Sequence, residues 1–168
     1  MSTPPRREAE RWYRQAGFDL KAARWNIEGG FHAQACFLAQ QAGEKALKAA
    51  LYFLGGRRRA LLTHSLVEMT ASLGTDDPDI AGRLDDARAL DLHYVPSRYP
   101  NGLPGGYPHQ FYARAQGDAA VAAAERILSS VAVFLTARGG HDIVEAPDES
   151  ADSARTSPTA ANEDEGTS

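Results

Sequence analysis

The sequence contains a single cysteine, Cys36, among its 168 residues. One thiol can form neither an intramolecular disulfide framework nor a thiolate metal cluster, and a chain of this length can bury a stable core without either. The five histidines are scattered without metal-ligand spacing, so no metal site and no cofactor are predicted. Sparse cysteine is typical of proteins in a reducing compartment.

Long apolar runs are also missing. No unbroken apolar stretch approaches the roughly 18 residues that a membrane-spanning helix needs, and the charged N-terminus lacks the apolar segment of a signal peptide. We therefore expect a soluble, cytoplasmic protein with no membrane partner. The phosphate-binding Gly-x-x-x-x-Gly-Lys-Ser/Thr loop, the His-Glu-x-x-His zinc motif and the Gly-x-Ser-x-Gly elbow are absent, which argues against the enzyme classes built on them.

The net charge of −4 averages two different segments. Residues 141–168 carry eight acidic residues against one arginine and almost no large apolar groups, so we expect a disordered acidic tail. Residues 1–140 carry 17 basic and 14 acidic residues, a formal charge of +3, and are expected to form the folded domain. This small excess permits contact with RNA or nucleotide phosphates, and a solvated mixed-charge surface is the alternative.

The sequence is helix-periodic and shows no strand-period stretch. Apolar residues recur at steps of three and four, the spacing of one helix face. The expected helices cover residues 7–28, 31–54, a short segment opening at 63–65, then 78–94 and 109–138. Five helices with mostly short connections predict an all-α, up-and-down antiparallel bundle of about five helices.

Two local features lie between the second and third expected helices. Arg57, Arg58 and Arg59 follow the second helix, where they either complement the helix dipole or contact a phosphate. Ser65 and Glu68 have the spacing of a capping box, with Thr63 as the alternative cap. His64, at this helix start, is typical of a structural turn.

Four patterns follow one another along residues 7–138. They are Trp12-Tyr-x-x-Ala16-x-x-Asp19-Leu20-x-x-Ala23, Ala35-Cys-Phe-Leu-Ala-Gln-Gln-Ala-x-Glu44-Lys45-Ala-Leu-Lys48, Thr63-His64-Ser65-Leu, and Leu90-Asp91-x-x-Tyr94-x-Pro96-x-Arg98-Tyr99-Pro100. Together they resemble the HEPN domain family. The resemblance implies a helical bundle over residues 1–140, usually paired as a homodimer. It also implies work on RNA or nucleotides, often as a toxin or effector beside a nucleotidyltransferase partner.

Active members of that family carry an Arg-x(4–6)-His motif and cut RNA without a metal. Arg88 and His93 match this spacing, and Arg57, Arg58 and Arg59 precede His64 at the same spacings. An arginine fork can hold phosphate oxygens as charge develops, and histidine titrates in the range that proton transfer requires. Five residues turn a helix by about 500°, so Arg88 and His93 would converge only at a frayed helix end or through a two-fold partner.

The remaining candidate residues surround this motif. Tyr94, Arg98 and Tyr99 either stack on a base and clamp a phosphate or pin a proline-rich loop to the bundle by aromatic packing. Asp91 either contributes to binding, by orienting His93 or pairing with an arginine, or forms a plain surface ion pair.

The first functional hypothesis is a metal-independent RNA endonuclease in which Arg88 binds phosphate and His93 transfers protons. The alternatives are a non-catalytic nucleotide-binding or partner-docking module and a purely structural helical adaptor.

Overall fold

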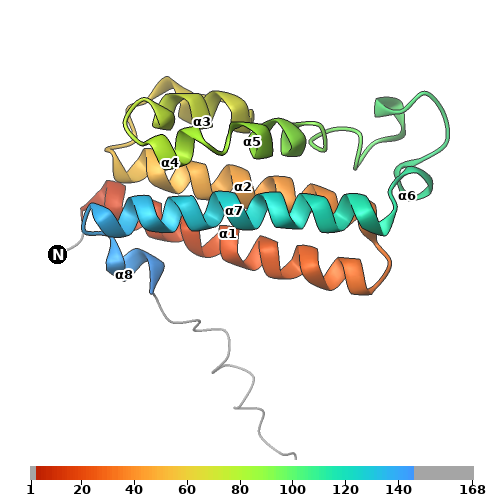
Figure 1. Cartoon of the computed structure of the whole chain (residues 1–168), viewed down its shortest axis with the longest axis horizontal. Helices are drawn as coiled ribbons and strands as arrows, with labels where there is room; N and C mark the ends of the chain where they lie inside the picture. The colour runs from red at the N-terminus through yellow and green to blue at the C-terminus, as the bar shows by residue number, and fades with distance from the viewer. Residues whose placement is uncertain (1–2, 146–168) are drawn as a thin grey trace, which may run out of the picture.

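The computed structural model describes residues 3–145, and all regular structure within them is helical (Figure 1). The α-helices are α1 (Pro4–Glu28), α2 (His32–Phe53), α3 (Leu66–Gly74), α4 (Pro78–Ala81), α5 (Leu84–Asp91), α6 (Pro108–Phe111), α7 (Arg114–Ala137) and α8 (His141–Val144). Two 3₁₀ turns, η1 (Arg59–Leu62) and η2 (Pro100–Gly102), lie in the connections. The prediction of an all-α bundle is confirmed.

Three long helices, α1, α2 and α7, lie side by side along the length of the molecule, and the short helices α3, α4 and α5 cover a second face of α2 and α7 (Figure 1). The many alanines of α2 let its neighbours approach closely, since small side chains keep helix axes near one another. Gly43 marks a close approach, because a Cβ atom there would lie 2.7 Å from Cδ2 of Leu66.

Two helices that the sequence analysis expected to be continuous are broken. The expected 78–94 helix is interrupted at Gly82, a residue of low helix propensity, and it stops at Asp91 instead of Tyr94. The expected 109–138 helix consists of α6 and α7, separated at Tyr112 and Ala113 by extended backbone. The side chain of Gln116 caps the N-terminus of α7 by accepting from the Ala113 N–H at 2.6 Å.

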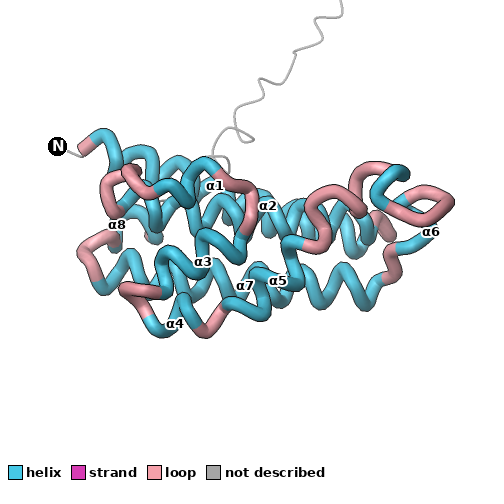
Figure 2. Tube along the Cα trace, turned by 90° about the horizontal axis from the view of Figure 1, so that it is seen from above, coloured by secondary structure: helices cyan, strands magenta, loops and turns pink. Residues whose placement is uncertain are grey.

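These breaks leave residues 92–107 as a loop between α5 and α6. We call this segment the proline-rich loop. It lies with α6 at one end of the bundle, and α8 lies at the other end (Figure 2). The candidate site is built where this loop meets α2.

Helical structure continues past residue 140, the expected end of the folded domain. Residues 141–144 form α8, and Ile143 on that helix is buried in the core, so the start of the expected tail is part of the bundle. An ion pair between Asp142 and Arg6 joins α8 to α1. The rest of the expected disordered tail, residues 146–168, lies outside the described residues.

Helix α7 is long and apolar enough, by length and composition, to cross a membrane. Within the bundle, 56% of its most apolar window is buried. Its residues Ile127, Val131 and Phe134 belong to the core. This burial is the pattern of a core helix, and it accounts for the apolar composition of α7.

Candidate functional site

A stripe of buried polar side chains runs along α2. Gln40, Glu44 and Lys48 are spaced four residues apart, which places them on one face of the helix, and their exposed fractions are only 0%, 4% and 7%. The Glu44 carboxylate accepts from Lys48 Nζ at 2.9 Å and from Gln40 Nε2 at 3.2 Å. Buried charges persist in a core only when they are paired and hydrogen-bonded in this way.

His64 contacts the Glu44 carboxylate from outside the helix. It lies in the turn between η1 and α3, with Nδ1 3.0 Å from Glu44 Oε1. An ionised carboxylate can only accept, so in this contact His64 Nδ1 is the donor. The His64 side chain is 60% exposed, whereas the Glu44 side chain is 5% exposed. A buried carboxylate therefore orients an accessible imidazole.

The proline-rich loop adds aromatic rings and a cation to this arrangement. The His64 ring stacks on Tyr94 with 5.3 Å between centroids and 17° between planes. The Arg98 guanidinium carbon lies 4.7 Å from the Tyr94 ring centroid and 4.5 Å from that of Phe37 on α2. Arg98 Nε also donates to the Tyr94 carbonyl oxygen at 2.8 Å. We refer to Phe37, Glu44, His64, Tyr94 and Arg98 as the Tyr94 site.

A hollow of about 370 Å³ opens beside this site. Its volume is within the range of ligand pockets, roughly 300–1,000 Å³. The side chains that line it are Gln34, Phe37, Ser97, Arg98, Tyr107, Pro108 and His109. Arg98 forms no ion pair with any residue in the described range 3–145, so its charge is available to a ligand at the edge of the hollow.

In the structure, the predicted catalytic residues Arg88 and His93 contact different residues. Arg88 Nη1 pairs with Asp85 Oδ1 at 2.6 Å on the exposed surface of α5. The His93 ring packs edge-on against Tyr112, 5.5 Å between centroids, with Nδ1 3.4 Å from the phenol oxygen. Burial lowers the pKa of His93 below its ordinary value, so this imidazole is neutral near pH 7. Their catalytic roles stay predictions.

Asp91 has a structural task that the sequence analysis did not foresee. Its carboxylate accepts from the backbone N–H of Leu66 at 2.8 Å and of Val67 at 3.2 Å, and from Ser65 Oγ at 2.8 Å. It therefore caps the N-terminus of α3 from the end of α5. Ser65 is the local cap that was predicted, since its Oγ accepts from the Glu68 N–H.

The other predicted binding residues remain close to the candidate site. Tyr99 is 51% exposed, and the Arg98 guanidinium lies 5.0 Å from its ring centroid. Tyr94 and Arg98 lie at the centre of the site, and their binding roles stay predictions.

Three members of the Tyr94 site were not among the predicted functional residues. Phe37 and Glu44 lie within one of the family-like patterns and are seven residues apart, which places them on the same helix face. His64 stands at the Arg-x(4–6)-His spacing from Arg57 to Arg59, but that spacing alone does not distinguish it from His93. The contact with Glu44 distinguishes His64 from His93. Because Glu44 and His64 are 20 positions apart, local spacing could not predict this contact.

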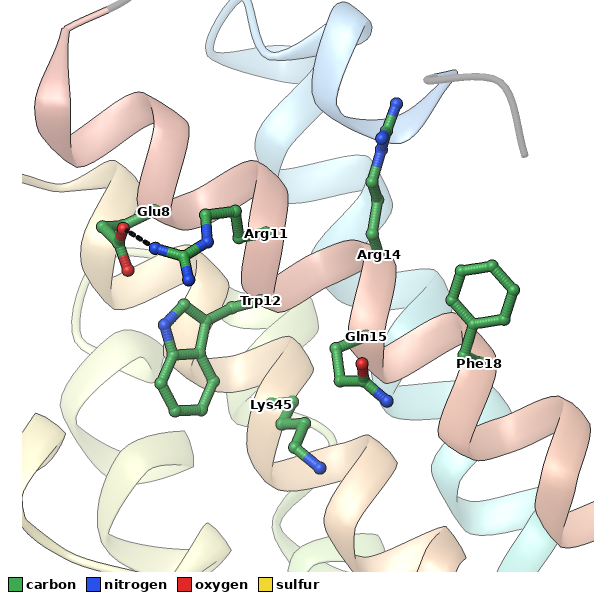
Figure 3. A pocket seen from close by; sticks show the side chains of 7 residues that line it. All are labelled: Glu8, Arg11, Trp12, Arg14, Gln15, Phe18 and Lys45. Atoms are coloured by element: carbon green, nitrogen blue, oxygen red, sulfur yellow. Dashed lines mark hydrogen bonds and ion pairs between the residues drawn. The ribbon is translucent and has the colours of Figure 1, made fainter. Parts of the chain in front are cut away.

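A second hollow, of about 510 Å³, lies between α1 and α2 (Figure 3). Trp12 and Lys45 face it from the two helices, and Arg14 extends away from them (Figure 3). Carboxylates of the chain already neutralise its cations: Arg11 pairs with Glu8 at 2.6 Å, and Lys45 pairs with Asp19. These cations offer less to an incoming phosphate than Arg98 does.

Comparison with known proteins places these features in a family. A model of the HEPN domain matches residues 9–134. A search of curated proteins found no match. Among solved structures, TT1696 from Thermus thermophilus is 35% identical, with a TM-score of 0.69 over 76% of this chain and 98% of that one.

Two further structures carry the HEPN description themselves. ST0689, described as an archaeal HEPN homologue, is 38% identical, with a TM-score of 0.60 over 73% of this chain and 93% of that one. An HEPN domain protein from Thermotoga maritima is 28% identical, with a TM-score of 0.60 over 75% and 98%. With the family model covering most of the bundle, these matches show that the chain belongs to the HEPN domain family.

Proposed function

We propose that this HEPN domain binds single-stranded RNA or its nucleotides at the Tyr94 site. The observation that carries the proposal is the placement of Arg98. Its guanidinium lies within 5.0 Å of the ring centroids of Phe37, Tyr94 and Tyr99, at the edge of a hollow and without an ion-pair partner among residues 3–145. A cation held among aromatic rings offers stacking to a base and charge to the adjacent phosphate.

The surroundings of Arg98 favour one or a few nucleotides over a long duplex. Tyr107 and His109 line the hollow, are exposed, and add a ring and a second nitrogen base to it. The modest basic excess of residues 1–140 cannot neutralise many phosphates, so binding is expected to be local and only moderately dependent on salt. Single-stranded RNA fits this description because its bases are free to stack.

The endonuclease activity predicted for Arg88 and His93 requires both side chains to reach the same phosphate. In one chain these residues contact Asp85 and Tyr112, respectively. A single phosphate would meet both groups if the chain beyond the end of α5 at Asp91 turned His93 toward Arg88, or if a second copy of the chain, in the predicted homodimer, brought its own residues to the site. A nucleotidyltransferase partner and a toxin role are also predictions of the family resemblance, and each requires its own test.

The test is fluorescence anisotropy with a labelled single-stranded RNA whose 2′-hydroxyls are methylated, so that it cannot be cut during the measurement. Arg98→Ala should weaken binding about 10- to 100-fold, the range expected for losing a charge-assisted phosphate contact. Arg11→Ala is the matched control, because it removes the same charge from the hollow between α1 and α2 and is expected to change binding less than about twofold.

Competition with unlabelled AMP, measured in the same assay, separates a mononucleotide site from one that requires a longer strand. Circular dichroism of each variant shows whether the bundle is retained. Wild-type protein that does not bind RNA or AMP at high concentration would overturn the proposal. Equal binding by wild type and folded Arg98→Ala would also overturn it, and a larger loss in Arg11→Ala would move the site to the other hollow.

A further inference from the structure

We propose that the acidic segment of residues 146–152 docks within the same chain on a basic face of α1 formed by Arg7, Arg11 and Arg14. This face borders the hollow between α1 and α2 and is separate from the Tyr94 site, so the inference does not depend on RNA binding there. Three observations support it: the two segments carry opposite charge, α8 brings them together, and the hollow offers a surface to pack against.

The first observation concerns the charge of α1. Arg7, Arg11 and Arg14 follow one another at steps of four and three residues, which places them on one side of the helix. Residues 4–14 carry four arginines against two glutamates, a net charge of +2. Arg7 is exposed and forms no ion pair with any residue of the described range 3–145. The ion pair that Arg11 makes within α1 is exposed and contributes little, so Arg11 can accept a second carboxylate.

The segment that follows α8 has the complementary charge. Asp148, Glu149 and Asp152 lie within residues 146–152, which contain no basic residue. The segment therefore offers three carboxylates to the three arginines of the basic face. Hydrogen bonds between carboxylates and guanidinium groups are charge-assisted and stronger than those between neutral groups.

The second observation is that α8 fixes the point from which this segment starts. Asp142 of α8 forms an ion pair with Arg6, and Arg6 Nη2 also donates to the Gly139 carbonyl oxygen at 2.6 Å. Ile143 is buried in the core and holds α8 against the bundle. Arg6 immediately precedes Arg7, so the chain leaves α8 beside the N-terminal end of the basic face. Figure 1 shows α8 at the same end of the bundle as the start of α1.

The length of chain is sufficient to cover the basic face. Arg14 follows Arg6 by eight residues, which is about 12 Å along the helix. From Glu145, the last described residue, an extended chain can carry Glu149 up to about 14 Å and Asp152 up to about 25 Å. A tether this short keeps the carboxylates at a local concentration in the millimolar range, so ion pairs that are individually weak can still hold the segment.

The third observation is the hollow itself. It has a volume of about 510 Å³ and is lined by Trp12 and Phe18 as well as by Arg11 and Arg14. Trp12 and Lys45 face it from α1 and α2 (Figure 3). A segment docked here neutralises the cations of α1 and covers the Trp12 ring. The consequence is that this face of the bundle is withheld from other anions, including phosphates, while the segment is in place.

The experiment uses the full chain with a nitroxide spin label attached at Ser150→Cys, in the middle of the segment. Cys36 is buried, and burial raises the pKa of its thiol to about 12, so the introduced thiol is labelled selectively in the folded protein. The nitroxide broadens the NMR signals of nearby nuclei, and the same sample with the label reduced is the reference. The Trp12 indole N–H signal should lose most of its intensity. The Trp25 signal should retain it, because Trp25 lies 13 residues, or about 20 Å, further along α1.

Two variants of the spin-labelled chain test the acidic residues without changing the bundle. The first neutralises the three acids of the segment and should restore most of the Trp12 intensity: Asp148→Asn/Glu149→Gln/Asp152→Asn. The matched control neutralises three acids further along the chain and should leave the broadening unchanged: Glu163→Gln/Asp164→Asn/Glu165→Gln.

Two further variants test the arginines. Arg7→Glu/Arg11→Glu reverses the charge of the basic face and should also restore the Trp12 signal. Arg57→Glu/Arg59→Glu is the matched control, because it reverses two exposed arginines at the other side of α2, and the broadening should persist. Raising the salt concentration should restore part of the signal in the parent chain, since salt screens ion pairs between exposed groups. Circular dichroism shows whether each variant retains the bundle.

The outcomes decide between the segment and other occupants of this face. Equal intensities of the Trp12 and Trp25 signals, each relative to the reduced sample, would overturn the proposal. Unchanged broadening in folded Arg7→Glu/Arg11→Glu would overturn it as well. A mixture of spin-labelled chain with isotope-labelled wild type should leave the Trp12 signal of the wild type intact. Broadening of that signal would assign the face to a second copy of the chain and would overturn docking within one chain. Failure of RNA to bind at the Tyr94 site would leave this test unaffected.

Discussion

The buried ion pair of α2 supports a quantitative prediction about stability. Lys48 Nζ lies 2.9 Å from Glu44 Oε1, with only 9% and 5% of the two side chains exposed. Lys48→Met retains most of the aliphatic stem but removes the ammonium group, which lies 5.3 Å from the Trp12 ring centroid, and it leaves the Glu44 carboxylate buried without this cation. Removing one partner of a buried pair costs about 3–5 kcal/mol of folding free energy. That is a large fraction of the roughly 5–15 kcal/mol that stabilises a typical domain.

The double variant Glu44→Gln/Lys48→Met should be more stable than Lys48→Met alone. The glutamine amide introduced by this substitution is neutral and still offers an oxygen to the donors around it, so no uncompensated charge remains in the core. Replacing a buried ion pair by neutral groups of similar volume is often close to neutral in stability. We therefore expect a coupling free energy between the two positions of about 2 kcal/mol or more, well above the error of additivity for independent sites.

Urea unfolding followed by far-ultraviolet circular dichroism measures these differences. With an m-value of about 1–3 kcal/mol/M, a loss of 3 kcal/mol lowers the midpoint by about 1–3 M. The double variant should recover most of that shift. A Lys48→Met midpoint within about 0.3 M of wild type, or a double variant that loses the sum of the two single losses, would refute the picture of a desolvated pair.

Three other residues give shorter predictions. Asp91→Ala should cost about 1–2 kcal/mol by removing the cap of α3, and an unchanged urea midpoint would contradict that role. Burial lowers the pKa of His93 below that of the unfolded chain, so stability should fall as pH drops from about 6.5 through the folded-state pKa. His93→Gln should flatten the dependence, and an unaltered pH profile would count against it. Burial raises the pKa of the Cys36 thiol to about 12, so it should react with a disulfide reagent at pH 8 only after unfolding; rapid reaction in the native state would contradict this.

Much of the bundle could be predicted from the sequence, because helices α1 and α2 are specified by local patterns. Apolar residues at three- and four-residue steps and the glycine pairs after each helix led to expected bounds of 7–28 and 31–54. The structure has Pro4–Glu28 and His32–Phe53. The cap at Ser65 was predicted for the same reason, since a cap is a contact between residues three positions apart.

The breaks in the later helices could not be predicted in this way. Apolar spacing continues through Gly82 and through Tyr112, so periodicity does not show the interruptions, which depend on a glycine of low helix propensity, on the Gln116 cap and on contacts with other segments. The α5 helix ends where Asp91 turns to the N-terminus of α3, about 25 residues earlier in the chain. The extended residues before α7 are stabilised by the Gln116 cap and by the packing of Tyr112 against His93. Periodicity contains no information about these partners.

The sequence identified only some residues of the Tyr94 site, because the others come from segments far apart in the chain. The sequence placed Tyr94 and Arg98 in one segment, but a histidine at the right spacing from an arginine occurred twice. The structure separates the two cases by their surroundings: His93 faces a phenol in a partly buried niche, and His64 faces a carboxylate and solvent. Spacing along the chain reports which residues share a helix face, whereas chemistry depends on which groups from other segments meet them.

The polar stripe of α2 connects stability to the proposed activity. Replacing a buried ion pair by well-packed apolar side chains is often neutral or stabilising, so Glu44 and Lys48 are not needed to fill this part of the core. The same carboxylate, however, is the group that fixes His64 against the bundle. Its cost to stability is therefore explained if the orientation of His64 matters. An apolar replacement of the pair that retained or raised stability while weakening the proposed RNA binding at the Tyr94 site would be the pattern expected of a core residue retained for function.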